Sequence, residues 1–298
     1  MMELLGVLLL VVLKSGGSAV AAGGNGAGDV PFGENYSVEW GNDHVTSFNQ
    51  GRRVQLSLDK NSGARFGSKS MYGSGFFEMK IRVPHQDSAG VVTAFYLISN
   101  KQNGHDELDF EFLGNREGKP ITLQTNIFTE GIGNREQRIS LKWFDPAADF
   151  HTYKILWNQH QIVFYVDDTP IRVFKNKAKA GVGYPASHPM QMECSLWNGE
   201  SWATDGGRSK IDWSRAPFRA EFQGFAVDGC VADPGSSSKS NSSSIRHCSS
   251  PDYWWNQNRF WTLNETEQIR YTKVRQTYMN YDYCADLSRF PTPPPECL

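Results

Sequence analysis

The chain has 298 residues, which is long enough for one large β domain or for two small domains. Its 30 basic and 32 acidic residues nearly cancel, so no basic field indicates nucleic-acid binding. Aromatic residues make up 13% of the chain and include 9 Trp. In a sugar-binding protein, such a content indicates stacking platforms as well as core side chains.

The N-terminal segment has the pattern of a cleavable secretion signal. Residues 4–13 form an apolar run that is too short to span a bilayer, and small residues with Ala19-Val20-Ala21 follow it. No Lys or Arg precedes the run, whereas such signals usually have one there. We expect a signal peptide over residues 1–21, a secreted mature protein and no membrane span.

Short apolar or alternating segments recur between turn signals from Val54 to about residue 260, and helical periodicity is nearly absent there. Residues 76–83 alternate apolar with charged side chains, and residues 91–99 form a continuous apolar run. Residues 160–174 predict a hairpin around Asp167-Asp168. Together these segments predict an all-β protein, an antiparallel sandwich of the jelly-roll type.

The stretch HDELDFEFLG, residues 105–114, is unusual for a strand. Alternation puts Glu107, Asp109 and Glu111 on one face and three bulky apolar side chains on the other. Like charges in a row repel one another, and Asp is disfavoured in strands. A solvated acidic edge or half of a calcium site are the ordinary alternatives. Three acids in strict alternation, backed by apolar residues, instead indicate a glycosidase site.

The spacing of the acidic trio suits a retaining glycosidase, which holds two carboxyl groups about 5–5.5 Å apart. The Cα atoms of Glu107 and Glu111 lie roughly 13 Å apart along a flat strand. On a concave sheet, two long side chains that lean together can close most of that gap. Crowded carboxylates also raise one pKa and so supply a protonated acid. We predict Glu107 as nucleophile, Asp109 as helper and Glu111 as acid/base, with no metal and no organic cofactor.

HDELDFEFLG resembles the active-site strand of the plant xyloglucan endotransglucosylase/hydrolases, a branch of glycoside hydrolase family 16. The resemblance runs from about Val38 to Cys297, and its further motifs are SAGVVTAFYL, REQRISLKWFDP, FHTYKILWN, IVFYVDDTPIRVFKN, SLWNGESWATDGG and YDYCADLSRFP. It implies a jelly roll in which the acidic strand lines a cleft on the concave sheet.

The resemblance also implies contacts to a glucan chain around the acidic trio. Polar contacts are expected at Gln124, Thr125, Asn126, Asn134, Arg135 and Glu136, and contacts on the donor side at Trp197, Trp202, Ala203 and Gly207. Of the two Trp, we expect one in the cleft and one in the core. Arg116 and Arg289 are expected to face the acceptor, with a solvated arginine and a structural ion-pair partner as the respective alternatives.

The composition changes sharply after Cys230, where DPGSSSKSNSSSIRH forms a Ser-rich insertion that cannot bury apolar surface. We therefore divide the chain into a signal peptide over 1–21, a jelly-roll catalytic domain over 30–229 and a C-terminal extension over 230–298. The resemblance implies that the extension packs on the sandwich and lengthens the acceptor side of the cleft.

A short helix is predicted within the C-terminal extension. Asn264 and Glu267 have the spacing of a capping box, and three apolar or aromatic residues follow at helical spacing. The expected helix runs from about Glu265 to Met279.

The chain has 5 cysteines, which in a secreted protein suggests two disulfides and one remaining thiol. The most economical pairing joins Cys230 to Cys248 and Cys284 to Cys297, and leaves Cys194 as a buried thiol. No Cys/His spacing resembles a zinc site.

Three glycosylation sequons occur, at Asn35, Asn241 and Asn264. Asn115, just after the acidic strand, lacks the hydroxyl residue that an acceptor sequence needs. His105 adjoins the acids, but a lone His is more often structural, so no role is assigned to it.

The acidic trio and the resemblance together predict a secreted, monomeric plant cell-wall (apoplastic) enzyme. It would cut the β-1,4-glucan backbone of a xyloglucan donor through a covalent glycosyl-enzyme and transfer the donor to a second xyloglucan chain. Residues 128–138 carry none of the extra residues that mark dedicated hydrolases in the family, which favours transfer. The alternatives are a xyloglucan hydrolase, a mixed-linkage β-glucanase and a non-catalytic lectin, although a lectin does not need three alternating acids.

Overall fold

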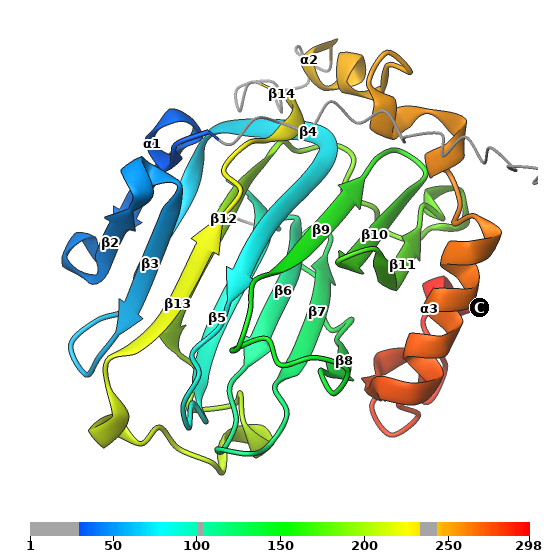
Figure 1. The fold of residues 1–298 in the computed structure, drawn as a ribbon. Helices are drawn as coiled ribbons and strands as arrows, with labels where there is room; N and C mark the ends of the chain where they lie inside the picture. Colours follow the sequence, from blue (N-terminus) through cyan, green and yellow to red (C-terminus); the bar gives the residue numbers. More distant parts are fainter. Residues whose placement is uncertain (1–29, 101–103, 233–242) are drawn as a thin grey trace, which may run out of the picture.

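The computed structural model describes residues 30–100, 104–232 and 243–298. The expected signal peptide, most of the Ser-rich insertion and the sequon at Asn241 lie outside these ranges. The described chain forms a curved antiparallel β-sandwich (Figure 1), which confirms the predicted fold. We name its two layers by one strand of each, the β6 layer and the β10 layer.

The β6 layer contains the acidic strand. Its strands are, in spatial order, β1 (Tyr36–Trp40), the first half of β4 (Ala64–Arg82), β12 (Met190–Asn198), β5 (Val91–Ser99), β6 (Glu107–Leu113), β7 (Thr122–Phe128), β8 (Gln137–Ser140) and β15 (Met279–Asp282). The β10 layer consists of β11 (Thr169–Lys175), β10 (Gln161–Val166), β9 (His151–Trp157), the second half of β4, β13 (Phe218–Gln223), β3 (Arg53–Leu58) and β2 (Val45–Phe48). The short strand β14 (Asp228–Val231) pairs with β4 where the layers meet.

Strand β4 belongs to both layers because it bends midway along its 19 residues. Its residues before the bend pair with β12, and those from Gly75 onward pair with β9. Glycine is needed at position 75, since a Cβ there would lie 2.7 Å from the backbone oxygen of Asp228. One strand therefore closes this end of the sandwich.

The core lies between the two layers and includes the apolar face of the acidic strand. Phe110 packs edge-on against Phe164 of β10 with 5.0 Å between ring centroids, and Phe112 packs against Tyr153 of β9 at 4.6 Å. Such pairs contribute about 0.5–1.5 kcal/mol each beyond the burial of their area. This packing fixes the register of β6, so the three acids must face the other way.

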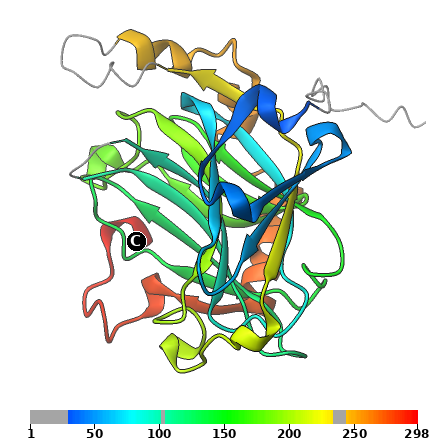
Figure 2. The ribbon, with the colours of Figure 1, turned by 90° about the vertical axis from the view of Figure 1, so that its left-hand side faces the viewer.

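Among the described residues, two α-helices are short, α1 (Phe32–Asn35) and α2 (Ser243–Arg246), and one is longer, α3 (Glu265–Tyr278). The longer helix confirms the predicted one, and its capping box is formed by Asn264 and Glu267. It ends one residue early because Met279 begins β15. Helix α3 buries Val274 and lies beside β11 (Figure 1). Figure 2 shows the C-terminal segment at the margin of the sandwich, where β15 pairs with β8.

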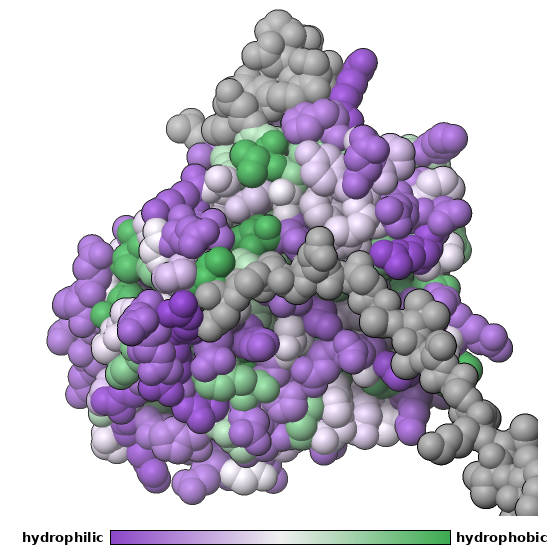
Figure 3. Space-filling model, turned by 45° about the horizontal axis from the view of Figure 1, so that its top comes forward, coloured by the Kyte–Doolittle hydropathy of each residue, from purple (hydrophilic) through white to green (hydrophobic). Residues whose placement is uncertain are grey.

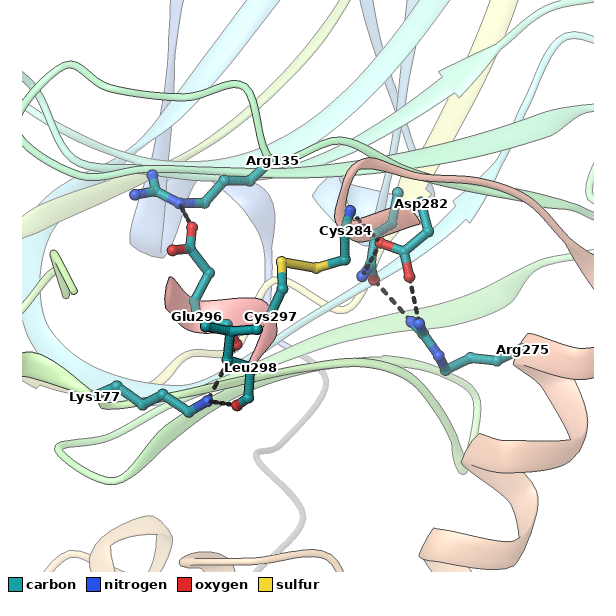
Figure 4. Close-up of a disulfide and its surroundings, with 9 residues drawn as sticks. Arg135, Lys177, Arg275, Asp282, Cys284, Glu296, Cys297 and Leu298 are labelled. Carbon is teal, nitrogen blue, oxygen red and sulfur yellow. Dashed lines mark hydrogen bonds and ion pairs between the residues drawn. A yellow bond between two sulfur atoms is a disulfide. The ribbon is translucent and has the colours of Figure 1, made fainter. Parts of the chain in front are cut away.

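The C-terminal extension contains two disulfides, and they are the predicted ones. Cys230 is bonded to Cys248 and Cys284 to Cys297, while Cys194 is a free and fully buried thiol. Figure 4 shows the polar contacts around the second disulfide. Those contacts are Arg135 with Glu296, Lys177 with the backbone oxygen of Leu298, and Arg275 with Asp282.

Among the described residues, no helix is long and apolar enough to cross a membrane. On the face shown in Figure 3, the described surface is mostly hydrophilic, with apolar residues in small groups. Two sequons can be placed. The Asn35 amide donates a 2.9 Å hydrogen bond to the Phe225 carbonyl, whereas Asn264 is exposed and uses only its Oδ1 atom for the helix cap. Glycosylation at Asn264 is therefore compatible with the cap.

Candidate active site

The acidic trio lies in a cleft on the outer face of the β6 layer. Strand β6 is paired on one side with β5 and on the other with β7, so residues directly opposite the acids share their face. The cleft measures about 370 Å³, and its lining comprises Ala94, Tyr96, Glu107, Asp109, Glu111, Gln124, Asn126, Phe128, Glu136, Ser195, Trp197 and Trp202.

Glu107 stands at one end of the row and is held by a histidine. Its Oε2 atom lies 2.9 Å from Nε2 of His105, whose ring stacks on Phe128 with centroids 5.2 Å apart. Burial raises the pKa of Glu107, while hydrogen bonds from Asp109 and His105 and the charge of His105 oppose that rise. His105 therefore contacts the predicted nucleophile, which the sequence reasoning missed.

Asp109 lies in the middle and is buried. Burial raises its pKa well above the usual range, and the charges of Glu107 and Glu111 and a hydrogen bond to Glu107 add to that rise. Its Oδ1 atom has no hydrogen-bond partner among the described residues. A charged carboxylate with an unpartnered buried oxygen is costly, so the site favours a protonated Asp109 that donates to Glu107.

Glu111 completes the row. Burial raises its pKa to about 7, and the negative charges of Glu107 and Glu136 add to the rise. A 2.6 Å hydrogen bond from Nε2 of Gln124 to its Oε2 atom and the charge of Arg138 act in the opposite sense. The surroundings thus allow an ionised Glu107 and a protonated Glu111 near neutral pH, which is the division of states that acid-assisted nucleophilic attack requires.

Both predicted tryptophans line the cleft. The rings of Trp197, on β12, and Trp202, in the loop after it, lie 6.1 Å apart. Each is partly buried, so the expectation that one of them belongs to the core is wrong. Two neighbouring indole rings beside a carboxylate row form a surface on which sugar rings can stack.

Thr125 is the first predicted contact that the structure does not bring to the cleft. Gln124 and Asn126 line the cleft, and the residue between them in β7 must point to the opposite face. Its side chain and carbonyl accept hydrogen bonds from buried Arg172 at 3.1 and 2.8 Å. Thr125 is therefore part of the core side of the sheet.

Arg135 also lies outside the cleft lining. It is only 9% exposed and forms a 2.6 Å ion pair with Glu296, together with hydrogen bonds to the carbonyls of Ile127 and Ile132. These partners use its guanidinium, so Arg135 anchors the C-terminal end of the chain (Figure 4). The expectation of a glucan contact at this residue is corrected accordingly.

Of the remaining predicted contacts, Glu136 lines the cleft, and the others do not: Asn134, Ala203, Gly207, Arg116 and Arg289. Arg289 donates 2.7 Å hydrogen bonds to both Glu136 and Asn134. It is thus a structural ion-pair partner, which was the alternative to an acceptor contact. Arg116 is exposed and lies 3.4 Å from Asp87. The last two contacts shape the loop around Trp202. Ala203 packs with Val92 and Leu113, and Gly207 adopts φ 83°, where a Cβ would lie 2.1 Å from the Ser201 oxygen.

Four lining residues were missed by the sequence reasoning: Ala94, Tyr96, Phe128 and Ser195. Three of them directly oppose members of the trio, Ala94 opposite Glu111, Tyr96 opposite Asp109 and Phe128 opposite Glu107. The sequence alone does not specify which strands pair. Residues that lie opposite the acids can therefore be assigned to the cleft only once the sheet order is known.

Comparisons with known proteins show the family to which the chain belongs. Residues 32–215 match the profile of glycosyl hydrolases family 16, and residues 249–297 match that of the xyloglucan endo-transglycosylase C-terminus. In solved structures, a lichenase (prokaryotic β-1,3-1,4-glucanase) derived from a mouse hindgut metagenome has the same fold. Its TM-score is 0.54 at 22% identity, over 67% of this chain and 96% of the lichenase. These matches define the class, a family 16 glycosyl hydrolase.

The curated relatives narrow the class further. Xyloglucan endotransglucosylase/hydrolase protein 2 of Arabidopsis thaliana is 54% identical over 295 residues, which cover 99% of this chain and 96% of that protein. Protein 3 of the same series and organism is 55% identical over 268 residues, 90% and 89% of the two chains. The chain therefore belongs to the xyloglucan endotransglucosylase/hydrolase family, as its motifs predict.

Proposed function

We propose that this protein cuts the backbone of xyloglucan and transfers the cut chain to a second xyloglucan molecule. The observation that carries the proposal is the carboxyl row of β6, where Glu107 and Glu111 have different surroundings on one face of one cleft. Membership of the xyloglucan endotransglucosylase/hydrolase family supports xyloglucan as the substrate.

In the first step, the Glu107 carboxylate attacks the anomeric carbon while Glu111 gives its proton to the glycosidic oxygen. The C–O bond to the departing chain breaks, and a covalent glycosyl-enzyme remains. Protonated Asp109 donates a hydrogen bond to Glu107. That bond and the contact from His105 hold the nucleophile in place.

In the second step, Glu111 is ionised and acts as the base. It takes a proton from the hydroxyl group of the incoming sugar, whose oxygen then attacks the anomeric carbon and releases Glu107. If water takes the place of the sugar, the same sequence gives hydrolysis. These carboxyl groups complete both steps by themselves, so the proposal includes no cofactor.

Transfer is favoured by the open connection between β7 and β8. Only residues 129–136 separate these strands, and a bridge between Thr129 and Ile132 keeps the turn tight. We place a long acceptor on the Glu111 side of the cleft, toward β15. On the other side, Trp197 and Trp202 supply the stacking surface for the donor.

The same proposal places the protein in the plant cell wall, as a secreted monomer. It keeps the division into a signal peptide over 1–21, a catalytic domain over 30–229 and an extension over 230–298. Asn35, Asn241 and Asn264 remain the candidate glycosylation sites.

The test is product analysis on two polymers, xyloglucan and an unbranched mixed-linkage glucan, each with and without a labelled xyloglucan oligosaccharide. We expect cleavage of xyloglucan and entry of the label into polymer. Cleavage of the mixed-linkage glucan alone would identify a β-glucanase. Binding of xyloglucan without any cleavage would identify a lectin.

A further inference from the structure

A single row of residues crosses the β6 layer from the C-terminal extension to the predicted acid/base. In the pairing register, Tyr281 of β15 lies opposite Arg138 of β8, Arg138 opposite Gln124 of β7, and Gln124 opposite Glu111 of β6. Directly opposed residues in an antiparallel sheet share one face and have close Cβ atoms. The row therefore brings a residue of the extension into line with Glu111.

Polar contacts run along this row. Nε of Arg138 donates a 2.7 Å hydrogen bond to Oε1 of Gln124, and Nε2 of Gln124 donates a 2.6 Å hydrogen bond to Oε2 of Glu111. The Arg138 guanidinium also lies over the ring of Tyr281, 5.2 Å from its centroid. Gln124 is only 4% exposed, so little water can replace these partners.

The contact from Arg138 decides which end of the Gln124 amide faces Glu111. An amide has an accepting oxygen and a donating nitrogen, and the two ends are nearly equal in shape. Arginine can only donate, so its Nε–H selects the oxygen and turns the NH₂ group toward Glu111. Without Arg138, the amide could turn its oxygen toward the carboxyl group and remove the donor from the ionised acid/base.

Tyr281 is itself held in place. Its hydroxyl group donates to Asp286 at 2.9 Å and accepts from Arg289 at 3.2 Å, and Arg289 forms an ion pair with Glu136. A cation–π contact of this kind is attractive, and it is stronger where water is excluded. The extension therefore limits the positions open to Arg138.

We propose that Arg138, held by Tyr281 of the C-terminal extension, is a positioning residue that fixes the Gln124 amide on the acid/base Glu111. The inference rests on the proposed function, since it concerns the same reaction. Its new element is that the extension takes part in orienting the proton-transferring group.

The titratable and charged groups that face Glu111 are Glu107 and Asp109 from its own strand and Glu136 and Arg138 from the β8 side. Arg138 is the cation that opposes the raised pKa of Glu111, and the bond from Gln124 acts in the same sense. Loss of Arg138 removes a positive charge near Glu111 and weakens the hydrogen bond from Gln124 to Glu111. Glu111 should then keep its proton to higher pH, so a smaller fraction of it should be ionised and able to act as the base in the second step.

The experiment compares Arg138→Met with the unchanged full-length protein on two donors, xyloglucan and a xyloglucan oligosaccharide with a nitrophenol leaving group. On xyloglucan, we expect kcat to fall about 10- to 100-fold, a part of the roughly 10²–10⁴-fold that a positioned acid/base contributes. On the activated donor, the burst of nitrophenol should be nearly normal, because that leaving group needs no proton. The high-pH limb of kcat/KM on xyloglucan should move upward.

The control variant is Arg275→Met. Arg275 joins the extension to the same strands through Gln137 and Asp282, but on the face opposite to Gln124. The Arg275→Met variant should have a lower Tm, while the high-pH limb of its kcat/KM profile should not move. A double-mutant cycle adds the decisive comparison. If Arg138 acts through Gln124, the double variant Arg138→Met/Gln124→Met should lose no more activity than Gln124→Met alone.

Equal losses on both donors, an unmoved pH limb or additive losses in the cycle would each overturn the positioning role. If Arg138→Met does not fold, Tyr281→Ala is compared with Tyr281→Phe. The Ala variant should shift the pH limb in the same direction by a smaller amount, the Phe variant should not, and two unshifted variants would overturn the proposal. Failure of the unchanged protein to cleave either donor would instead count against the proposed function.

Discussion

The three carboxyl groups of β6 are chemically similar, and their surroundings give them different tasks. Asp109 is the most buried and lies between two charges, which favours its protonated form. Glu107 receives hydrogen bonds from both sides in sequence, from His105 and Asp109. Glu111 has the Gln124 amide and a nearby cation. Spacing alone predicts the row, while burial and partners assign the tasks within it.

The first prediction concerns the two glutamates. Glu107→Ala should abolish cleavage and transfer, because the covalent route is lost, while Tm should change little. Glu111→Ala should lose most activity on xyloglucan but keep release of an activated leaving group that needs no protonation. Near-normal turnover of xyloglucan by a folded Glu107→Ala protein would contradict the assignment.

The second prediction concerns pH. Cleavage needs ionised Glu107 and protonated Glu111, so kcat/KM should be bell-shaped. Activity should fall as the pH rises through about 7, where Glu111 loses its proton. On the acid side, the limb should lie above the usual carboxyl range, because burial raises the pKa of Glu107. A flat profile between pH 5 and 9 would contradict this assignment of states. In Glu111→Ala, with an activated donor, the upper limb should disappear from the burst phase.

At the level of elements, β7 shows what strand periodicity can and cannot supply. Its alternation alone places Thr125 on the face opposite to Gln124 and Asn126. The sequence is therefore enough to exclude Thr125 from the three predicted contacts. The ion pair that removes Arg135 from the cleft cannot be predicted in this way, because its partner Glu296 is far along the chain. The fold determines long-range partners of this kind, and no local sequence pattern predicts them.

The third prediction tests the corrected role of Arg135. Arg135→Ala leaves Glu296, whose side chain is only 8% exposed, without its cation. Breaking such a pair typically costs about 3–5 kcal/mol, so the free energy of unfolding should fall by that order while KM for the donor changes little. Arg116→Ala is the matched control. Its pair with Asp87 is exposed and should be worth less than about 1 kcal/mol. Unchanged stability with a large rise in KM would restore Arg135 as a glucan contact.

The fourth prediction separates the two disulfides. The Cys284–Cys297 loop is short and lies directly after β15, so replacing both residues by Ser should destabilise the protein by about 3 kcal/mol or less. Because β15 is loosened, transfer should fall more than hydrolysis. The same change at Cys230 and Cys248, next to β14 and α2, should cost stability without altering the ratio of transfer to hydrolysis. Equal ratios in both double variants would separate the extension from acceptor use.

At the level of the whole molecule, the fold was predictable because strand patterns, turn signals and the helix cap agree with one another. The acidic row was predictable because three like charges on one face of a strand repel one another and are unusual without a functional role. The rest of the cleft depends on sheet order. Ala94, Tyr96 and Ser195 join the site only because β5 lies beside β6 and β12 lies beside β5, and a single sequence does not specify that order.

In the proposed reaction, a sugar hydroxyl group, and not water, releases Glu107 from the glycosyl-enzyme. Water is abundant, so an acceptor must be held well enough to compete, and well-oriented groups can reach effective molarities of about 10⁵–10⁸ M. In the proposed reaction, the acceptor binds on the Glu111 side of the cleft, toward β15.

The most direct test follows the size of xyloglucan polymer and the number of reducing ends, with and without a labelled xyloglucan oligosaccharide. We expect added acceptor to shorten the polymer rapidly and label to enter it. Without oligosaccharide, reducing ends should accumulate slowly. If reducing ends accumulate at the same rate in both cases and no label enters the polymer, the protein is a hydrolase and the account is wrong.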